Sequence, residues 1–525
     1  MGWWRSKQVN EFFARAAEQK KRSYARGDRQ IKPLTADLTE NRRLIEERIG
    51  DSSDVVFRPF HLGNTDQQAL IVYVDGMSDT KLIEESILQP LMMNIHAIEG
   101  QKVDSASFTT STYFHNHVIP IIDVLEVVDV NNVIEHVVIG YTALLIDGEA
   151  CCMLFGTKEI QGRNVDEPDT ESVVRGPRVG FVESLRTNMT LLRQQITDPN
   201  FTFLSYQIGE RNTKSVVVAY VKGIVDINLL EEVQQRLSRI RIDDVLESGY
   251  IEQLIEDDHF SPFPQVQNTE RPDRVVAALL EGRVAIMVDG TPFVLLVPVT
   301  LNMLLQSPED YYTRWLPASL MRFLRYFAAF AALFVPAIYI SFVSFHQGLI
   351  PTKLAIAMAS SRLGVPFPSL LEALIMEITI EILREAGLRL PKPVGQTVGL
   401  VGGLVIGQAA VQAGIVSPVM VIVVSLTAIC SFAIPQYDAG IALRILRFGA
   451  MFFAAVFGLY GVIMFFLFIA IHLVKLKSFG VPYTAPIVPY DVSDWKDTVI
   501  RLPFFKMKFR PEILRVEDKV RRGKR

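Results

Sequence analysis

The sequence predicts a soluble α/β N-terminal region of two similar subdomains, followed by an all-α multi-pass membrane domain. First, 49% of the 525 residues are hydrophobic and the mean hydropathy is slightly positive, which suits a chain that is only partly soluble. Second, the 44 residues from Val394 to Tyr437 carry no charge, and two membrane helices need roughly 20 apolar residues each. Third, short apolar strands, glycine turns and capped helices alternate between about residues 38 and 299, as in an α/β fold.

Positive charge is concentrated at the two ends of the chain. Residues 1–34 hold nine Lys and Arg against three acids, and residues 501–525 hold ten against three, although the whole chain has a net charge of −4. Basic segments next to membrane helices favour the cytoplasmic side, so we expect both termini there and an even number of spans. Residues 1–37 are expected to be a basic segment that is either amphipathic on a membrane surface or disordered.

The three cysteines, Cys151, Cys152 and Cys430, form neither a disulfide framework nor a metal-binding spacing. This usage suits a reducing compartment for the large N-terminal part.

One element of the α/β region occurs twice at an offset of 147 residues. Tyr73-Val74-Asp75-Gly76 is followed by Asp79, and Tyr220-Val221-Lys222-Gly223 is followed in the same way by Asp226. Each copy predicts an apolar strand, a turn at glycine and a helix capped by the aspartate.

A second element recurs at an offset of 142 residues. Gly140 and Asp147-Gly148 match Gly282 and Asp289-Gly290. Each copy predicts a helix ended by glycine, a strand, an Asp-Gly turn and a second strand.

The two copies place the α/β subdomains at residues 38–160 and 161–310, and neither carries a catalytic pattern. No phosphate loop, nucleophile elbow or paired-histidine metal motif occurs. His115 and His117 alternate on a possible strand, which is more often a satisfied or exposed pair than a metal site. The sequence therefore predicts no enzyme, no cofactor, no metal and no nucleic-acid partner.

A proline-rich loop precedes the second copy of the helix that ends at glycine. Three prolines fix the backbone, so the loop should be extended and stiff. We expect it to act as a rigid clasp between subdomains, with other subunits or with the membrane domain. Arg271 should then donate its planar fork to a carboxylate or to carbonyls. The residues assigned to the loop are Pro262, Pro264, Gln267, Arg271 and Pro272.

This loop and the segment after it resemble the A-subunit family of bacterial spore germinant receptors, the GerA family. The resemblance rests on Pro-Phe-Pro-Gln-Val-Gln-x-Thr-Glu-Arg-Pro-Asp, then Leu-Leu-Glu-Gly-Arg-Val-Ala-Ile, then Val-Asp-Gly-Thr-Pro, all within residues 262–292. It extends over the whole layout of a soluble region followed by a membrane region.

The membrane domain is expected over residues 311–477, with a basic C-terminal tail over 478–525. Its predicted spans are residues 326–345, 394–414, 417–437 and 448–471. Asp438, Arg444 and Arg447 are expected in a loop before the last span.

A row of glycines lies at four-residue intervals on the first arm of the uncharged stretch, and so on one helix face. Small residues of this kind let helices approach closely in lipid. A tight helix contact and a pore or gating role are both open. The glycines are Gly395, Gly399, Gly403 and Gly407.

An acidic amphipathic helix is predicted over residues 367–388. Carboxylates among membrane spans are costly against lipid, so they either line a water-filled path or lie in water on a surface helix. The sequence leaves open whether this helix spans, re-enters or lies on the membrane. The pore candidates are Glu372, Glu377, Glu381 and Glu385.

The resemblance implies much more than the residues alone. It implies an A subunit that works with B and C subunits in the spore inner membrane, with its large N-terminal region facing the cytoplasm or spore core. The complex would respond to nutrients, and the A subunit would form a homo-oligomer in membrane lipid that makes or gates an ion channel. Two alternatives stay open: a paralogue that conducts or amplifies without its own nutrient-binding partner, and a secondary transporter, which would favour inverted repeats in the membrane region.

Overall fold

The computed structural model describes residues 32–63, 65–93, 119–159, 167–168, 170–391, 402–403, 405–491 and 493–522. The chain divides into two compact units, one of residues 1–162 and 193–202, the other of residues 163–192 and 203–525. The second α/β domain and the helical region therefore belong to one unit, and the segment 193–202 groups with the first α/β domain instead.

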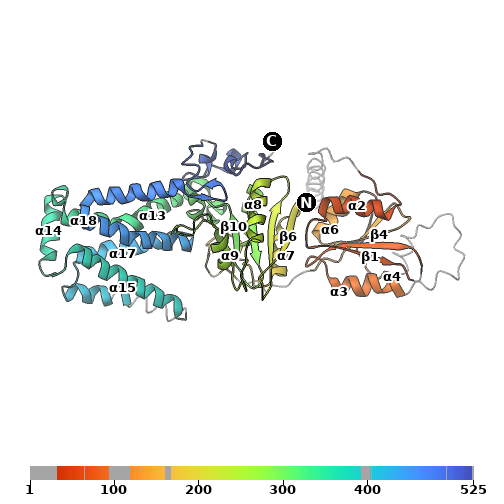
Figure 1. Cartoon of the computed structure of the whole chain (residues 1–525), viewed down its shortest axis with the longest axis horizontal. Coiled ribbons are helices and arrows are strands. Elements are labelled where there is room, and N and C mark those ends of the chain that lie inside the picture. Colours follow the sequence, from red (N-terminus) through yellow and green to blue (C-terminus); the bar gives the residue numbers. More distant parts are fainter. Residues whose placement is uncertain are drawn as a thin grey trace, which may run out of the picture. The chain divides into compact units, whose positions relative to one another are not determined.

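The first α/β domain is a five-stranded antiparallel sheet with helices on both faces (Figure 1). Its strand order is β1-β2-β4-β5-β3. Residues of α2 and α6 share one hydrophobic core with the sheet, and residues of α3, η1 and α4 share the other. Because both faces are covered, strands β4 and β5 are buried along their whole length. The elements are α2 Leu38–Ile49, β1 Val55–His61, β2 Gln68–Val74, α3 Thr80–Ile83, η1 Glu84–Leu88, α4 Gln89–Met93, β3 Val124–Val127, α6 Val130–Ile139, β4 Thr142–Ile146 and β5 Cys152–Phe155.

The second α/β domain repeats this arrangement, with strand order β6-β7-β9-β10-β8. Helices α8 and α9 pack on the sheet as α3 and α4 do in the first domain. The elements are α7 Leu185–Gln195, β6 Phe201–Ile208, β7 Lys214–Val221, α8 Ile227–Ser238, α9 Ser248–Ile255, β8 Gln267–Thr269, α10 Pro272–Glu281, β9 Val284–Val288 and β10 Val294–Val297.

The register of the strands follows the two sequence offsets residue for residue. Ala69 pairs with Ile146 in the first sheet, and Val216, at an offset of 147, pairs with Val288, at an offset of 142. The helix caps repeat as well: Asp79 and Asp226 both accept backbone N–H groups at an N-terminus. Two copies of one α/β unit account for both observations.

The repeat also includes a helix that the sequence pattern did not reveal. The backbone N–H of Leu38 at the start of α2 donates to Asp147 at 3.3 Å, and that of Leu185 at the start of α7 donates to Asp289 at the same distance. Leu38 and Leu185 are 147 residues apart. The helix that precedes each sheet is therefore part of the duplicated unit.

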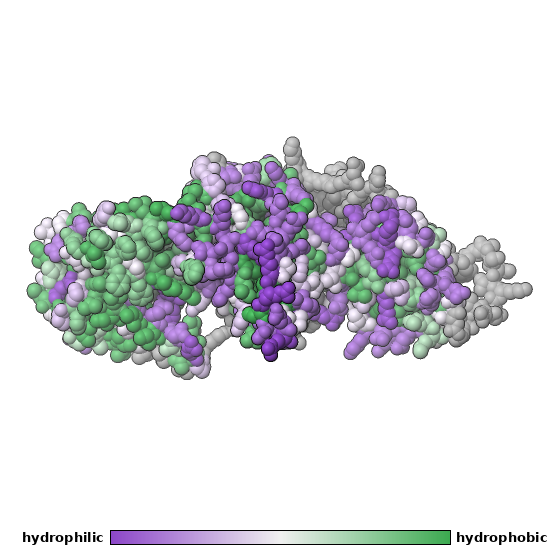
Figure 2. All heavy atoms as spheres, in the orientation of Figure 1, coloured by the Kyte–Doolittle hydropathy of each residue, from purple (hydrophilic) through white to green (hydrophobic). Residues whose placement is uncertain are grey.

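The helical region follows the second domain and contains two helices long and apolar enough to cross a membrane, α13 and α18. Hydrophobic residues cover most of its visible face (Figure 2). Residues 405–412 are also helical. The elements from the end of the second sheet are α11 Leu301–Leu304, α12 Glu309–Tyr312, α13 Trp315–Ser344, η3 Gln347–Leu349, α14 Thr352–Arg362, α15 Ser369–Arg389, α17 Pro418–Phe432 and α18 Tyr437–Lys475.

Helix α18 is a hairpin of two antiparallel arms that turns at Gly458, where φ is 60° and ψ is −140°. A Cβ atom built on Gly449 would lie 2.7 Å from the ring of Phe465, and the rings of Phe453 and Phe465 are 5.2 Å apart. In a straight helix, residues 16 apart would be separated by about 24 Å. The expectation of one span over residues 448–471 was therefore wrong, because the chain reverses in the middle of that range.

The helices run side by side between a domain end, which contacts the second α/β domain, and a distal end. α13 runs outward, and its last turn meets the tip of the hairpin, where a Cβ on Gly458 would lie 2.8 Å from the ring of His346. α15 begins at the distal end, where Ser369 bonds Ser344 at 2.8 Å, and reaches the α17–α18 turn at the domain end. The acidic helix thus runs along the bundle with the other helices (Figure 1).

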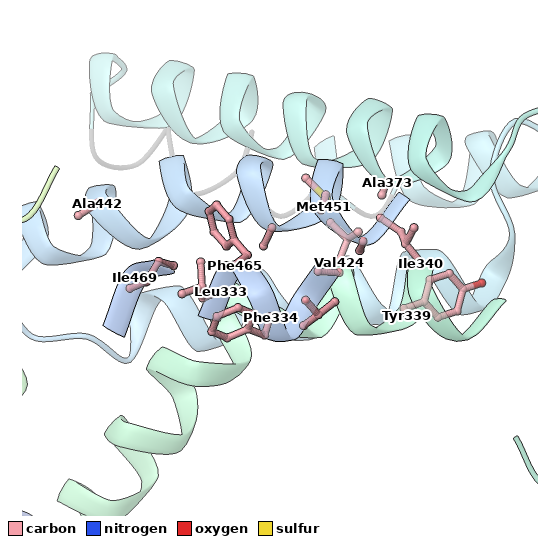
Figure 3. Close-up of a cluster of buried hydrophobic side chains, with 14 of the residues drawn as sticks. Leu333, Phe334, Tyr339, Ile340, Ala373, Val424, Ala442, Met451, Phe465 and Ile469 are labelled. Atoms are coloured by element: carbon pink, nitrogen blue, oxygen red, sulfur yellow. The ribbon is translucent and has the colours of Figure 1, made fainter. Parts of the chain in front are cut away.

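The core of this bundle combines side chains from α13, α15, α17 and both arms of α18 (Figure 3). Leu333 and Phe334 of α13 lie beside Phe465 and Ile469 of the second arm. Asp438, Arg444 and Arg447 are in the first arm of α18, so their expected place in a loop was wrong.

The segment after α18 packs on the second α/β domain and is not a free basic tail. Tyr483 is fully buried and its backbone carbonyl accepts from the N–H of Leu301 at 2.8 Å. Arg501 is buried and donates to the carbonyls of Asp310 and Thr313. Its short elements are β11 Lys477–Ser478, β12 Val481–Pro482, η4 Asp494–Lys496, η5 Phe504–Lys506 and η6 Glu512–Leu514.

Candidate functional site: the domain junction and the charged pairs of the helical region

The proline-rich loop lies where the second α/β domain meets the helical region. Phe263, between two of the prolines, is buried in the hydrophobic core of the helices and stacks on His472 at 6.2 Å between ring centroids. Ser261 bonds His472 at 2.9 Å, and the hydroxyl of Tyr483 donates to the carbonyl of Pro264 at 2.8 Å. A stiff loop loses little conformational entropy when it docks, which suits a clasp at this junction.

The edge strand β8 continues the junction with polar contacts. The Asn268 side chain donates to Asp438 at 2.7 Å and accepts from Gln436 at 2.6 Å. Gln267 is fully buried, and its amide lies 3.2 Å from that of Gln436. Buried polar groups are costly unless paired, so these amides fix one register between strand and helix.

Arg271 closes the loop from inside the domain. Its guanidinium is buried and holds Asp273 through two hydrogen bonds of 3.1 and 2.8 Å. It also donates to the carbonyls of Glu171 and Pro177, each at 3.1 Å. The expected use of the planar fork, on a carboxylate and on carbonyls, is confirmed.

The first α/β domain contains the strand equivalent to β8, which is β3, but not the residues of the signature loop. At the offset of 142, Gln267 corresponds to Leu125 and Asn268 to Glu126, both of which are exposed. The signature residues are therefore not required by the fold of the unit. They are specific to the copy that contacts the helices.

A half-buried carboxyl faces this junction. Burial, followed by the negative charges of Asp438 and Glu256, raises the pKa of Glu252 on α9 to about 8. Asp438, which contributes to this shift, accepts a hydrogen bond from Asn268. The junction therefore holds a proton that responds to pH near neutrality.

All four glutamates of the acidic helix are paired with arginines. The pairs are Glu372 with Arg362 at 2.8 Å, Glu377 with Arg447 at 2.5 Å, Glu381 with Arg384 at 3.1 Å and with Arg444 at 3.5 Å, and Glu385 with Arg389 at 2.5 Å. The sequence analysis missed these partners. The signal was the presence of arginines inside otherwise apolar helices, where a lone charge is costly.

The four glutamates do not share one environment. Glu372 and Glu377 are buried between helices, whereas Glu381 and Glu385 are 45% and 58% exposed. Arg447 joins three helices, because it pairs with Glu377 on α15 and donates to the carbonyl of Ala332 on α13 at 2.6 Å. Glu372 and Glu377, nearer the distal end, therefore connect helices of the bundle, whereas Glu381 and Glu385 are exposed at its surface.

The glycine row is described only in part, since Gly395 and Gly399 lie outside the described residues. A Cβ on Gly403 would meet nothing within 4 Å, and one on Gly407 would touch Val421 at an ordinary 3.7 Å. The close approach is instead at Gly402, where a Cβ would lie 3.0 Å from Leu383. Among the residues that the structure describes, then, none fills the space at Gly403.

Among the residues that the structure describes, no three His, Cys, Asp or Glu side chains are grouped to hold a metal ion.

Two copies of one α/β unit, followed by an apolar helical bundle with internal ion pairs, define a class of proteins with a membrane-type helical region. The family model described as Bacillus/Clostridium GerA spore germination protein matches residues 43–513. The chain belongs to this GerA spore germination family, as the signature loop indicated.

Individual relatives agree with the family. The chain is 46% identical to spore germination protein B1 of Bacillus subtilis (strain 168), over 93% of this chain and 99% of the relative. It is 51% identical to spore germination protein A1 of the same organism, over 70% of this chain and 77% of the relative. It is 40% identical to spore germination protein GerLA of Bacillus cereus, over 94% of this chain and 98% of the relative. The chain is also similar to the crystal structure of the N-terminal domain of the A subunit of the Bacillus megaterium spore germinant receptor GerK3. The match covers 51% of this chain and 97% of the solved chain, with 33% identity and a TM-score of 0.40.

We predict that Arg271→Ala destabilises the second α/β domain by about 3–5 kcal/mol, because it leaves Asp273 buried without its cation. The measurement is thermal unfolding of the purified full-length chain, together with its level in assembled receptor. Arg211→Ala is the control, since Arg211 and Asp243 form an exposed pair at 3.6 Å and should cost about 1 kcal/mol or less. Equal effects of the two substitutions would contradict a clasp held by Arg271.

We predict that Glu252→Gln flattens the pH dependence of stability. The pKa of Glu252 rises from 4.5 to about 8 on folding, so protonation of Glu252 stabilises the folded chain. This contribution to stability is fully present below pH 4.5 and is lost as the pH rises toward 8. The wild-type Tm should therefore fall relative to that of Glu252→Gln between pH 5 and 8. Glu231→Gln, on an exposed position of α8, is the control and should follow the wild type. Parallel curves for wild type and Glu252→Gln would reject a buried proton at the junction.

Proposed function

We propose that this chain is the A subunit of a nutrient-responsive spore germination receptor, which self-associates in the membrane to form or gate an ion channel. It would act with B and C subunits in the spore inner membrane, with the α/β domains in the cytoplasm or spore core. The names of the relatives support the role in germination. The channel, the oligomer and the partner subunits are inferences.

The distribution of charge around the helices supports a multi-pass arrangement. Exposed apolar side chains cover α13, α17 and both arms of α18. The bundle enters and leaves at its domain end, which also holds most of its cations, and a cytoplasmic excess of Lys and Arg is the usual signature of orientation. The cations at this end are Arg314, Arg322, Arg325, Arg384, Arg389, Arg444, Lys475 and Lys477.

The observation that carries the channel proposal is the set of glutamate–arginine pairs inside an apolar bundle. Ionisable residues within membrane helices are costly and usually mark an ion or proton path or a switch between states. Glu381 and Glu385 are both paired and exposed, and Glu381 can face a water-filled path while Arg444 compensates its charge. In a ring of copies, such groups would set the field along the path.

The open face at Gly403 supports self-association. A small residue whose added Cβ would meet no described residue of its own chain leaves room for a helix from a second copy. Exposed large apolar residues are present on the same helix, at Val405 and Ile406.

We expect Glu381→Gln and Glu385→Gln to lower the preference for cations, because each removes a negative charge and leaves its arginine. The measurement is the reversal potential of the reconstituted chain across a salt gradient. Glu377→Gln is the matched control: its carboxylate is buried against Arg447, so it should lower stability and the amount of assembled protein. If Glu381→Gln and Glu385→Gln both conduct with unchanged selectivity, these acids are a solvated face and the path is built from other helices.

We expect Gly403→Leu to weaken self-association while the single chain still folds, because the added side chain enters open space. Cross-linking or mass photometry in detergent gives the oligomeric state, and thermal unfolding reports the fold. Gly402→Leu is the contrasting variant, since it meets Leu383 within the chain and should lower the Tm. Gly348→Leu, in the distal η3 turn, also meets nothing within 4 Å and should leave both properties unchanged. A wild-type oligomer in Gly403→Leu would reject this surface as a contact between copies.

A further inference from the structure

A cavity of about 690 Å³ lies at the domain end of the bundle. Its walls are the last turns of α15, the turn between α17 and α18, strand β8 and residues 170–171. All of these belong to one compact unit. Asn268, Gln436 and Asp438, which bond one another at the domain junction, form part of its lining.

Arg444 lines the cavity and is under-partnered. Its side chain is only 9% exposed, yet it makes no hydrogen bond within the described part of the chain. Its nearest charge is Glu381, whose Oε1 lies 3.5 Å from Nε, and its guanidinium lies over the Tyr437 ring at 5.6 Å. A buried guanidinium has five N–H donors, and burying them without acceptors is costly.

Arg384 faces the same cavity from α15. Its side chain is 8% exposed, its one hydrogen bond is a 3.3 Å contact with Ser431, and its ion pair is with Glu381. Among the described residues, its Nε and Nη1 atoms have no hydrogen-bond acceptor. Glu381 is thus the single carboxylate shared by two buried arginines.

The two acids that line the cavity, Glu171 and Asp438 of α18, are already engaged. Glu171 pairs with Arg274 at 3.1 Å and accepts from Thr269 at 2.8 Å, and Asp438 accepts from Asn268. Neither Glu171 nor Asp438 forms an ion pair with Arg384 or Arg444. Arg384 and Arg444 therefore keep N–H donors that have no acceptor in the described part of the chain, and an anion with several acceptor oxygens would satisfy them.

Apolar side chains continue from the cavity along the outside of the bundle. Phe432 and Leu388 line its rim and are largely exposed, and Ile429 lies one turn before Phe432 on the same exposed face of α17. A ligand with an anionic head and an apolar tail fits this surface. Basic pockets between helices at the cytoplasmic end of a membrane domain take the head groups of acidic lipids in this way.

We propose that the cavity binds the phosphate of an anionic phospholipid, held by Arg384 and Arg444, with its acyl chains along Leu388, Ile429 and Phe432. The lipid supplies the acceptors that the two arginines lack, and it ties the ends of α15, α17 and α18 to one another next to the second α/β domain. The inference rests on the membrane placement in the proposed function, but not on ion conduction.

The test uses the full-length chain in neutral detergent, with phosphatidylglycerol, phosphatidylcholine and inorganic phosphate as separate probes. Native mass spectrometry gives the retained lipid, and a titration gives the affinity. Wild type should retain phosphatidylglycerol over phosphatidylcholine, and Arg444→Met should bind it at least about tenfold more weakly, since a charge-assisted contact is lost. Arg389→Met is the matched control, because Arg389 forms an exposed pair with Glu385 on the same helix as Arg384.

A wild-type Tm for lipid-free Arg444→Met shows that the variant folds, and Arg384→Met provides an independent second test. Equal retention of phosphatidylglycerol by wild type and both variants overturns the proposal. So does equal retention of the two lipids. Binding of inorganic phosphate alone, with the same dependence on Arg444, assigns the cavity to a free anion instead. Dissociation of the lipid-free oligomer in Arg444→Met assigns it to an acidic contact between proteins. If the chain binds phosphatidylglycerol but conducts no ions, the channel proposal is overturned and the lipid site stands.

Discussion

The helical region depends on keeping every buried arginine close to a carboxylate. Arg447 reaches Glu377 and a carbonyl of α13, so one cation fixes three helices against one another. At the junction, Arg322 is fully buried between Asp310 at 3.0 Å and Asp497 at 2.6 Å, which connects the start of α13 to the C-terminal segment. Buried pairs of this kind add little net stability, but removing one partner is severe, so they select one arrangement of helices over others.

The two α/β units show how one scaffold acquired that attachment. Both copies keep the sheet order, the glycine that ends α6 and α10, and the strand register. Pro262 has a counterpart in Pro120, but only the second copy has Pro264, Pro272, the amides of β8 and Arg271; the position of Arg271 is held by Asp129 in the first copy, where the side chain caps α6. The edge strand that is exposed in one unit became the surface that meets the helices in the other.

Much of this architecture was readable from the sequence, because the signals were local. The glycine turns, the aspartate caps and the constant offsets predicted the duplicated unit, and the uncharged stretch predicted apolar helices. The reversal at Gly458 was not readable, since a single glycine in an apolar run is compatible with a continuous helix. The partners of Glu377 and Glu381 on α18 were also hidden, because Arg447 and Arg444 are far from α15 in sequence and only packing brings them together.

The difference between the two offsets has a historical meaning. Elements through Asp79 and Asp226 are 147 residues apart, and elements from β3 and β8 onward are 142 apart, so the copies differ in length by five residues. The change lies between Asp79 and β3 in the first copy and between Asp226 and β8 in the second, where the second copy carries α9. Duplication of one gene segment, with a later change of length in that interval, accounts for both offsets, because such a change leaves the pairing of the strands unaltered.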